Sequence, residues 1–414
     1  MSNELRKDAD VIVKAAIDAA LPDNAVRRAL ENYPLSGRVR LVAMGKAAWQ
    51  MAHAAWALLG DKIQAGVVVT KYGHSKGGIS DFTIIEAGHP VPDENSYKGA
   101  QAAIDLVEGL TAQDTVLFLV SGGGSALFEK PLVPPDEITD ITKQLLACGA
   151  DIVEINTLRK RLSAVKGGKF AEICAPAKVY SIILSDVLGD PLDMIASGPA
   201  YPDSATAEDA AAIIEKYKLR LSPEAMELMK IETPKALDNV ETCITGSVRQ
   251  LCAAAEKACV QLGYEPVVLT DCLACEAKEA GAFLGAMARY YAKKEKSVAF
   301  IAGGETVVHL TGKGLGGRNQ EIALSAADLI AGIPGAAVFS VGSDGTDGPT
   351  DAAGGYADYE TKAALKEKGL DIFKVLADND AYHALKAVDG LIMTGPTGTN
   401  VNDVSVLLLK HERK

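Results

Sequence analysis

Short apolar runs alternate with amphipathic stretches along the first half of the chain. Apolar positions recur at helical spacing over residues 1–32, which predicts a helix at the start. Strands are predicted at residues 38–45, 65–70, 82–87, 115–120 and 179–187, with helices such as residues 46–60 between them. Asp93 or Asn95 is a suitable cap for the helix after the third strand. Because strands alternate with helices and are apolar on both faces, the pattern predicts a parallel sheet covered by helices on both sides.

This pattern is interrupted near residue 238. The stretch 231–243 is polar and carries Pro234. A chain of 414 residues is also long for one hydrophobic core, so two domains are expected. We therefore predict domains of residues 1–238 and 239–414.

The second half shows a different mixture of elements. It predicts a long alanine-rich helix, a hairpin over residues 297–312 and two strands around a Gly/Thr-rich loop in residues 389–409. Hairpins pair antiparallel strands, whereas helical crossovers join parallel ones. The smaller second domain should therefore be an α/β domain with a mixed sheet.

Charge and composition exclude several classes of partner. The formal net charge is −12 and no basic block occurs, so we expect no nucleic-acid partner, which would need a basic face. The start of the chain is a charged amphipathic stretch rather than a signal peptide, and no apolar run reaches membrane-spanning length. The pair Cys272 and Cys275 lacks the further ligands of a zinc site. We expect a cytoplasmic protein with no membrane partner, whose few cations are concentrated wherever it binds an anion.

Lys46 lies where a predicted strand ends and a helix begins. Open α/β sheets bind their ligands at this edge. A helix N-terminus is an unfavourable place for a cation, so a lysine there indicates an anion for it to meet. The alternative is a solvated lysine.

Three consecutive glycines follow the apolar strand 115–120 and open a helix. Glycines let the backbone approach a ligand closely, and free N–H groups at a helix start bind oxyanions. The flanking hydroxyls could add donors, although a tight turn without a ligand is the alternative. The candidate residues are Ser121, Gly122, Gly123, Gly124 and Ser125.

A cluster of cations occurs farther along the chain. Its members are Arg159, Lys160, Arg161, Lys166 and Lys169. In a chain this acidic the cluster creates a local positive field. A solvated helix face would nevertheless explain most of these charges.

Carboxylates follow two of the predicted strands. Asp186 emerges at the end of the strand 179–187, where it could accept a proton from a hydroxyl or bind Mg²⁺. Asp344 and Asp347 lie in a Gly/Thr-rich loop without the spacing of an EF-hand. Hard oxygen ligands of this kind suit Mg²⁺ and phosphate chemistry, but turns favour Asp and Gly for conformational reasons as well.

Residues 312–317 match the string G-x-G-x-x-G. A dinucleotide-binding turn should open a βαβ unit, with an acidic residue about 20 positions farther at the end of the second strand. Here the candidate acid, Asp328, falls inside the helix that follows the string. Arg318 opens that helix, and its planar guanidinium suits a phosphoryl group in transfer. We therefore interpret the string as a loop that presents Arg318.

Nine stretches in one order, spread over nearly the whole chain, resemble the glycerate 2-kinases of the bacterial and archaeal type that carries a C-terminal MOFRL domain. They are "AMGKA", "GHPVPD", "SGGGSAL", "NTLRK", "LSDVLGDP", "SGP", "GGRNQE", "GSDGTDG" and "TGPTGTNVND". The resemblance implies a Rossmann-like, doubly wound α/β domain and a smaller α/β domain, with the active site in the cleft between them. It also implies ATP- and Mg²⁺-dependent phosphorylation of D-glycerate at the 2-hydroxyl, giving 2-phosphoglycerate.

Lys46 and Arg318 are the active-site residues that the resemblance implies most directly. We expect them to neutralise charge on the migrating phosphoryl group from separate domains, while Asp186 orients the hydroxyl or shares the metal with Asp344 and Asp347. The remaining candidates for binding substrate or nucleotide are Asn156, Arg159, Gly316, Gly317, Asn319, Thr397 and Asn400.

Two other functions stay open at this point. One is an NAD(P)H-dependent reductase of hydroxypyruvate or tartronate semialdehyde, since some members of the family carry the name hydroxypyruvate reductase. The other is a regulator that binds phosphorylated metabolites without turnover. The expected partners are D-glycerate and a nucleotide, and the chain could form a homodimer.

Overall fold

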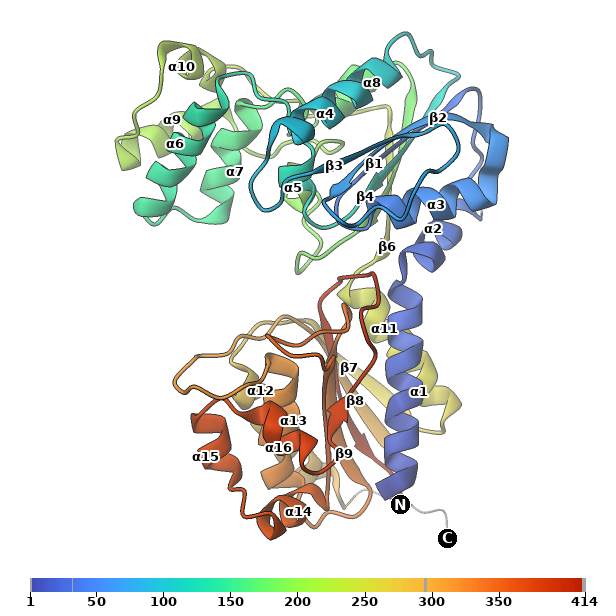
Figure 1. Ribbon diagram of the computed structural model, residues 1–414, viewed down its shortest axis with the longest axis vertical. Coiled ribbons are helices and arrows are strands. Elements are labelled where there is room, and N and C mark those ends of the chain that lie inside the picture. The colour runs from blue at the N-terminus through green and yellow to red at the C-terminus, as the bar shows by residue number, and fades with distance from the viewer. Residues whose placement is uncertain (1, 32, 294–295, 412–414) are drawn as a thin grey trace. The chain divides into compact units, whose positions relative to one another are not determined.

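A computed structural model describes residues 2–31, 33–293 and 296–411 and divides the chain into two compact units (Figure 1). Residues 25–245 form one of them, which we call the insert unit. Residues 2–24 and 246–411 form the other, the terminal unit. The first helix thus belongs with the C-terminal half, which differs from the predicted division into residues 1–238 and 239–414. Its amphipathic pattern shows that one face is buried, but not against which partner.

The insert unit is built on a six-stranded sheet with the order β3-β2-β1-β4-β5-β6. Its strands are β1 (Val39–Met44), β2 (Ile63–Lys71), β3 (Thr83–Ala87), β4 (Thr115–Val120), β5 (Lys178–Leu184) and β6 (Val240–Gly246). The pairs from β3 to β5 are all parallel. This is the strand order of a Rossmann-like sheet.

Successive residues of the central strands point into two different cores. Leu41 and Leu117 pack against α2 (Pro22–Leu30) and α3 (Ala48–Leu59). Val42 and Phe118 pack on the other face, whose helices are α4 (Glu94–Val107), α5 (Gly124–Leu127) and α8 (Lys169–Cys174). Helices on both faces confirm the predicted doubly wound arrangement.

Two local predictions for this part of the chain have different outcomes. The helix predicted over residues 1–32 is divided into α1 (Ser2–Ala20) and α2, because Pro22 cannot continue a helix but suits the first position of a new one. Residues 1 and 32 lie outside the described residues. Asp93 caps α4 as predicted, accepting hydrogen bonds from the N–H groups of Asn95 and Ser96.

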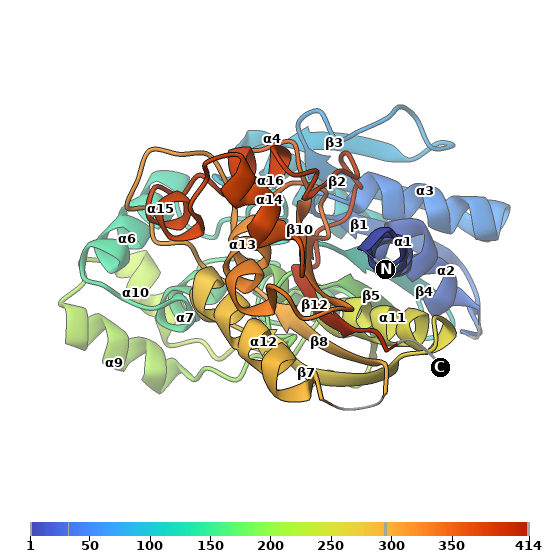
Figure 2. The same ribbon diagram turned by 90° about the horizontal axis from the view of Figure 1, so that it is seen from below.

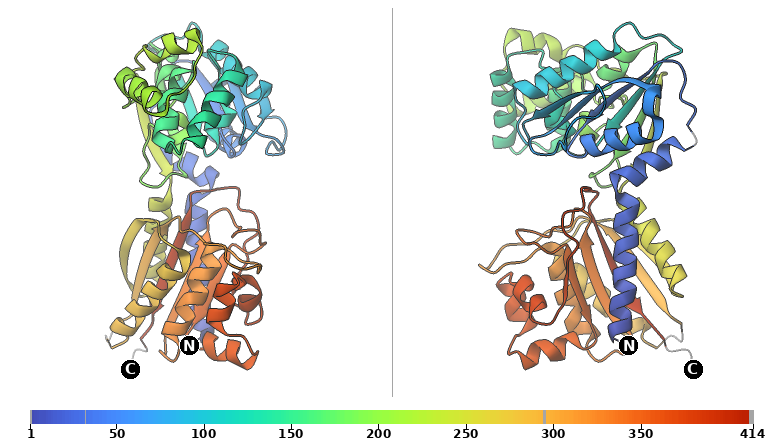
Figure 3. Two further views of the ribbon diagram at one scale, coloured as in Figure 1. Left: turned by 90° about the vertical axis from the view of Figure 1, so that its left-hand side faces the viewer. Right: turned by 45° about the vertical axis from the view of Figure 1, so that its right-hand side comes forward.

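A group of helices beside the sheet has a core of its own. These are α6 (Pro135–Ala147), α7 (Ile152–Arg161), α9 (Ala207–Tyr217) and α10 (Pro223–Met229), drawn in green in Figure 3. Leu145, Leu158 and Ile213 are among the buried residues that they share. The segment between α8 and α9 contains β5 and the short η2 (Ile195–Ser197).

The terminal unit contains a second six-stranded sheet, with the order β11-β10-β9-β12-β8-β7. Its strands are β7 (Glu265–Leu273), β8 (Val298–Gly304), β9 (Ala336–Gly342), β10 (Gly354–Asp358), β11 (Leu391–Ile392) and β12 (Asp403–Leu409). Only β7 and β8 are parallel among the described pairs. This confirms the predicted mixed sheet.

The hairpin predicted over residues 297–312 does not form. β8 ends at Gly304, and the chain does not turn back as an antiparallel strand but makes one isolated parallel bridge between Val307 and Glu276. The N–H groups of Glu305 and Val307 donate to backbone carbonyls of residues 273 and 275, so the second apolar run contributes no strand. Its Leu310 is 82% exposed, which shows that apolar character alone did not place these residues in a core.

Helices cover both faces of the terminal sheet (Figure 2). On one face lie α12 (Ala277–Tyr291), α13 (Arg318–Ile330), α14 (Thr361–Glu367), α15 (Ile372–Ala377) and α16 (Ala381–Lys386). On the other face α1 lies beside α11 (Val248–Gln261), as the right panel of Figure 3 shows. Within the described residues, no helix combines the length and the apolar character needed to cross a membrane.

Candidate active site

Lys46 lies at the switch point of the insert sheet. The chain leaves β1 toward α3 on one face, whereas it enters the neighbouring β4 from α4 on the other. Ligands of such sheets bind at the carboxyl ends of the strands at this point. The N–H group of Lys46 donates to the carbonyl of Gly122 at 2.9 Å, which joins the two turns. The side chain is half-buried, and its ammonium has no hydrogen-bond or ion-pair partner among the residues that the structure describes, so it is available for an anion.

Three side chains converge on the turn of residues 122–124, which we call the three-glycine turn. A Cβ atom on Gly122 would lie 2.2 Å from a carboxylate oxygen of Asp186. A Cβ atom on Gly123 would lie 3.0 Å from the ring of His89 and 3.3 Å from Cγ of Lys46. The approach at Gly122 is closer than a real Cβ atom allows, and Gly123 has a φ of +85°, which other residues rarely adopt. Both glycines are therefore needed for Asp186, His89 and Lys46 to surround this turn.

His89 belongs to this site although the sequence did not single it out as a binding residue. Burial lowers the pKa of its imidazole, and the nearby cations Lys46 and Lys71 and the imidazole of His74 lower the pKa further. The ring is therefore biased toward its neutral form beside the free ammonium of Lys46. The cluster as a whole is electropositive, as an anion site requires.

The two serines that flank the glycines have different surroundings. The Ser121 hydroxyl accepts a hydrogen bond from the N–H group of Ala47 at 3.0 Å, and the residue is 2% exposed, so it ties two turns together. Ser125 is half-exposed, and its hydroxyl lies 3.0 Å from that of Ser197. The Ser197 hydroxyl in turn donates to the side-chain carbonyl of Asn156 at 3.3 Å. Ser125 can thus meet a ligand, whereas Asn156, 5% exposed, lies behind it.

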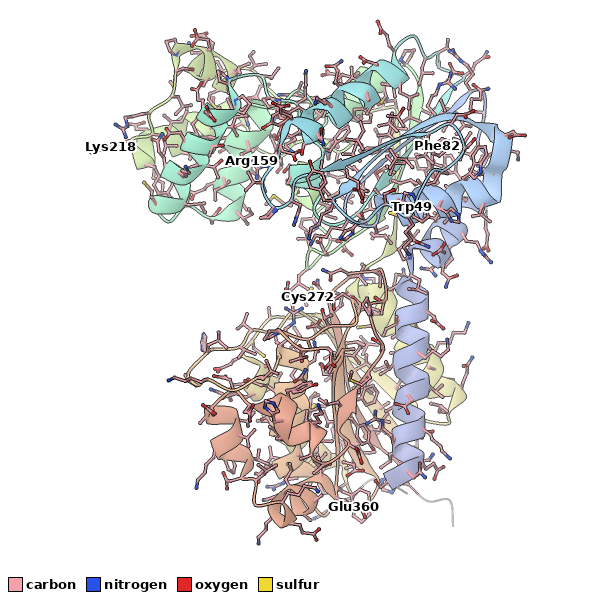
Figure 4. All side chains as sticks on the ribbon, viewed as in Figure 1. Trp49, Phe82, Arg159, Lys218, Cys272 and Glu360 are labelled. Carbon is pink, nitrogen blue, oxygen red and sulfur yellow. The ribbon has the colours of Figure 1, made fainter. Side chains whose placement is uncertain are left out.

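Most of the predicted cation cluster is buried rather than solvated. Lys160 is 2% exposed and lies 2.9 Å from Asp203, and Arg161 is 1% exposed. Lys169 donates to three backbone carbonyls near the end of α7. The solvated helix face considered from the sequence is therefore wrong for these residues. Arg159, labelled in Figure 4, is half-buried on α7 and has no side-chain partner within the described part of the chain.

Lys166 supports the backbone that follows the three-glycine turn. Its side chain is fully buried, and its ammonium donates to the carbonyls of Ser125 at 2.7 Å and Phe128 at 3.1 Å. Glu129 lies 3.4 Å away. Burial lowers the pKa of Lys166 to about 8, against the opposing charge of Glu129. A cation thus holds the backbone that follows the glycines.

Arg318 is the first residue of α13 in the terminal unit. Its Nε donates to Asp403 at 2.6 Å and its Nη2 donates to the second oxygen of the same carboxylate at 3.1 Å. Its Nη1 donates to Glu305 at 3.0 Å. Burial opposes the charge, but Asp403 and Glu305 outweigh it and raise the pKa of Arg318 above its usual value. The guanidinium is thus held charged and in a fixed plane.

The loop of residues 312–317 is not arranged for a dinucleotide. The N–H groups of Thr311 and Gly312 donate to the side chain of Asn379. Those of Lys313 and Leu315 donate to the carboxylates of residues 378 and 380. A pyrophosphate needs such N–H groups free and no carboxylates beside them. The loop is tied down so that Gly316 and Gly317 lead into α13, which agrees with its interpretation as the support of Arg318.

Asp347 contributes to the same helix start. Its two carboxylate oxygens accept hydrogen bonds from the N–H groups of Asn319 at 3.1 Å and Gln320 at 2.8 Å. The carboxylate also accepts one from the Asn319 side-chain amide, so Asn319 is used internally rather than for a ligand. Burial raises the pKa of Asp347 to about 7. Asp347 acts as a helix cap contributed by a distant loop.

The three predicted metal ligands have different surroundings. Within residues 2–31, 33–293 and 296–411 no group of three or more His, Cys, Asp or Glu side chains could hold a metal ion. Asp186 lies in the insert unit, Asp347 is used as a cap, and Asp344 accepts a hydrogen bond from the N–H group of Thr346 at 2.9 Å. Mg²⁺ commonly binds through one or two carboxylates together with substrate phosphates. Of the three, Asp186 beside Lys46 has the surroundings that fit such a role.

The predicted loop residues Thr397 and Asn400 lie near Asp344. The hydroxyl of Thr397 donates to the carbonyl of Ser343, and its N–H group donates to that of Asp344. Asn400 is exposed. The two loops therefore stabilise each other at the same edge of the terminal sheet as Arg318.

The sequence missed several residues that shape these sites, chiefly His89, Glu305 and Asp403, and it did not show that Lys166 of the predicted cation cluster is buried. His89 follows a predicted strand in a turn rich in Gly and Pro, and this position is a signal that could have identified it. For the buried charges there was no comparable signal, because an isolated Lys or Asp in a sequence does not reveal that it is buried.

Comparisons with known proteins extend these observations to the whole chain. Residues 8–230 match the family described as a domain of unknown function, DUF4147, and residues 298–403 match the MOFRL family. The D-glycerate 2-kinase of Thermotoga maritima is 53% identical over 98% of both chains. The glycerate 2-kinase of Pyrococcus horikoshii is 41% identical over 97% of both chains, and a relative from Agrobacterium vitis with the name hydroxypyruvate reductase is 40% identical.

Solved structures agree with this similarity. The crystal structure of the glycerate kinase from Thermotoga maritima superposes with a TM-score of 0.95 over 99% of this chain and 100% of that one. A crystal structure from Pyrococcus horikoshii superposes with a TM-score of 0.93 at 40% identity, covering 99% of each chain. Both units and the elements that carry Lys46 and Arg318 fall within these alignments.

Proposed function

The chain belongs to the glycerate 2-kinase family, and from this premise we infer that it transfers the γ-phosphoryl group of ATP to the 2-hydroxyl of D-glycerate. The products are 2-phosphoglycerate and ADP. The observation that carries this inference is the similarity over 98% of the chain to the D-glycerate 2-kinase of Thermotoga maritima, because the matched length spans the elements that carry both cations. The free ammonium of Lys46 beside the three-glycine turn supports it independently.

We propose that Lys46 and Arg318 act together on the migrating phosphoryl group. Phosphoryl transfer depends on positioning and on neutralising the charge of the equatorial oxygens. One cation comes from each unit, so the reaction requires the two units to bring them to one substrate and to exclude water, which would otherwise hydrolyse ATP.

Asp186 is proposed to act on the acceptor side. A carboxylate within reach of the glyceric hydroxyl can take its proton as the oxygen attacks phosphorus. The same carboxylate can also hold Mg²⁺ that arrives with the nucleotide, since the chain offers no complete set of ligands within the described residues. Half-exposed Ser125 and the three-glycine turn are the proposed contacts for an anionic group of the substrate.

The reductase alternative has a specific point against it and one in its favour. In its favour, a relative from Agrobacterium vitis has the name hydroxypyruvate reductase. Against it, the loop that resembles a dinucleotide turn donates its N–H groups to the side chains of residues 378–380, so these groups are not available for a pyrophosphate. NADH oxidation with hydroxypyruvate would support the reductase.

The deciding experiment is a phosphorus NMR spectrum of the product made from D-glycerate, ATP and Mg²⁺. A phosphate on C2 is coupled to one proton and gives a doublet, whereas one on C3 is coupled to two and gives a triplet. We expect the doublet. A triplet would make the enzyme a 3-kinase, and binding without any product would favour the regulator.

A further inference from the structure

The partners of Arg318 differ sharply in burial. Asp403 is 5% exposed and binds the guanidinium through two hydrogen bonds on its Nε edge. The side chain of Glu305 is 46% exposed and binds through one hydrogen bond at Nη1. Bidentate pairs with a buried carboxylate define the plane of a guanidinium, whereas exposed ion pairs contribute little free energy. One partner is therefore fixed and the other can be replaced.

The backbone that carries Arg318 is fixed as well. Asp347 is 2% exposed and caps the N–H groups of the two residues that follow Arg318. A Cβ atom on Gly317 would lie 2.3 Å from the Asp347 carboxyl carbon, so this contact needs a glycine. Both the start of α13 and the side chain are thus held by buried carboxylates from other elements.

We propose that Asp403 is a positioning residue for Arg318 and that Glu305 is the counter-ion that the phosphate of ATP displaces. Asp403 fixes the Nε edge, so only the Nη1 side of the fork can exchange its partner. The incoming phosphate takes the place of the exposed carboxylate, and the guanidinium keeps its orientation throughout. This inference rests on the proposed function, because it needs Arg318 to meet a phosphoryl group.

A double-mutant cycle tests the role of Asp403. In the full-length protein, Asp403→Asn should lower kcat by about 10- to 100-fold, the range known for residues that orient metal ligands, which play a comparable positioning role. In an Arg318→Ala background the same substitution should change kcat by less than about twofold, because Asp403 acts through Arg318. Equal losses in the two backgrounds would overturn the proposal, since they would show that Asp403 acts only through the fold.

Asp358→Asn is the matched control. Asp358 is also a buried carboxylate of the terminal sheet, 6% exposed, and it binds Thr361 and the N–H group of Glu360. It pairs with Ala337 at one end of β9, whereas Asp403 pairs with Gly342 at the other. The control should lose stability and retain kcat.

Glu305→Gln tests the exchange and does not depend on the folding of a core variant. Removing the competing charge should lower KM for ATP by about two- to fivefold, the range set by an exposed ion pair, with kcat unchanged. A higher KM or a lower kcat would overturn the exchange. If the wild-type protein makes no 2-phosphoglycerate, the proposed function itself fails, and that result is separate from either outcome.

Discussion

The two cation sites differ in how their cations are paired and supported. Lys46 has no side-chain partner within the described residues, and the backbone around it is supported by a buried lysine, Lys166. Arg318 is paired with two carboxylates, and its helix start is supported by a buried aspartate. A free ammonium on a flexible stem can follow a charge that moves, whereas a clamped guanidinium presents a fixed plane. Under the proposed mechanism, Lys46 would follow the transferring group, whereas Arg318 would define where it arrives.

Removing each cation should have the largest effect and should separate the two sites. Lys46→Ala and Arg318→Ala should each lower kcat by about 10²- to 10³-fold, the usual loss for one electrostatic contact to a transition state. Their stabilities should differ. Lys46→Ala should stay within about 0.5 kcal/mol of the wild-type free energy of unfolding, while Arg318→Ala should lose about 1–3 kcal/mol because it removes the two hydrogen bonds that Arg318 donates to buried Asp403.

Steady-state kinetics and chemical denaturation of the same preparations measure both quantities. Lys62→Ala, which removes an exposed lysine from η1 (Gly60–Lys62), is the control for a change of net charge. Near-normal turnover in either alanine variant would remove that residue from the proposed mechanism. Equal losses of stability would contradict the contrast between a free and a clamped cation.

The next prediction concerns the space at the three-glycine turn. Gly122→Ala places a methyl group 2.2 Å from the present position of the Asp186 carboxylate, which must move. A displacement of about 1 Å at a reacting group can cost about 100-fold in turnover. Gly78→Ala is a matched control, because its added Cβ meets no atom within 4 Å. We expect kcat to fall by about 10- to 100-fold for Gly122→Ala alone, and similar rates for both variants would argue against a role for Asp186.

Much of the insert unit could be predicted because its signals are local. Apolar strands buried on both faces and the capping residue Asp93 appear directly in the sequence. The partner of α1 could not be predicted, since an amphipathic face does not specify what covers it. The run of residues 306–310 resembles a strand, because its apolar residues do not reveal what they pair with. In the structure Val307 makes an isolated bridge with Glu276 and the run forms no strand.

The candidate site was predictable in a similar, partial way. Lys46 and Arg318 follow from position at strand and helix ends together with the family resemblance. Asp347 was predicted as a metal ligand, because an aspartate in a Gly/Thr-rich loop looks the same whether it binds Mg²⁺ or caps a helix 28 residues earlier. Asp403 was missed, and the burial of Lys166 was not predicted, because burial of a charge is a tertiary property.

The buried lysine of the insert unit should appear in the pH dependence of stability. The pKa of Lys166 is lowered to about 8 in the folded protein from 10.5. Between these pH values the unfolded state binds more protons, so the free energy of unfolding should rise with pH. Lys166→Met lacks this contribution. The difference in stability between wild type and variant should therefore grow by up to about 3 kcal/mol from pH 8 to pH 10.5, at 1.36 kcal/mol per pKa unit.

Denaturation of both proteins at several pH values measures this difference, and other titrating groups cancel because they are shared. A difference that does not change with pH would show that folding does not lower the pKa of Lys166. The terminal unit supports its cation with carboxylates. The difference in free energy of unfolding between wild type and Asp403→Asn should therefore not grow in this way above pH 8.

The smallest expected effect concerns Ser121, which distinguishes support from contact within the insert unit. Its hydroxyl bonds to the backbone of Ala47 and Met44 and is 2% exposed, so Ser121→Ala should lower the free energy of unfolding by about 1 kcal/mol. Because the hydroxyl faces the protein rather than the ligand, kcat/KM should fall by much less than the 10²-fold of a lost electrostatic contact. Ser125→Ala is the matched variant, and its half-exposed hydroxyl should affect KM for D-glycerate more than stability. If Ser121→Ala raised KM more than Ser125→Ala did, the substrate would have to enter between the two turns, and the free ammonium of Lys46 would then mark the rim of the site rather than its centre.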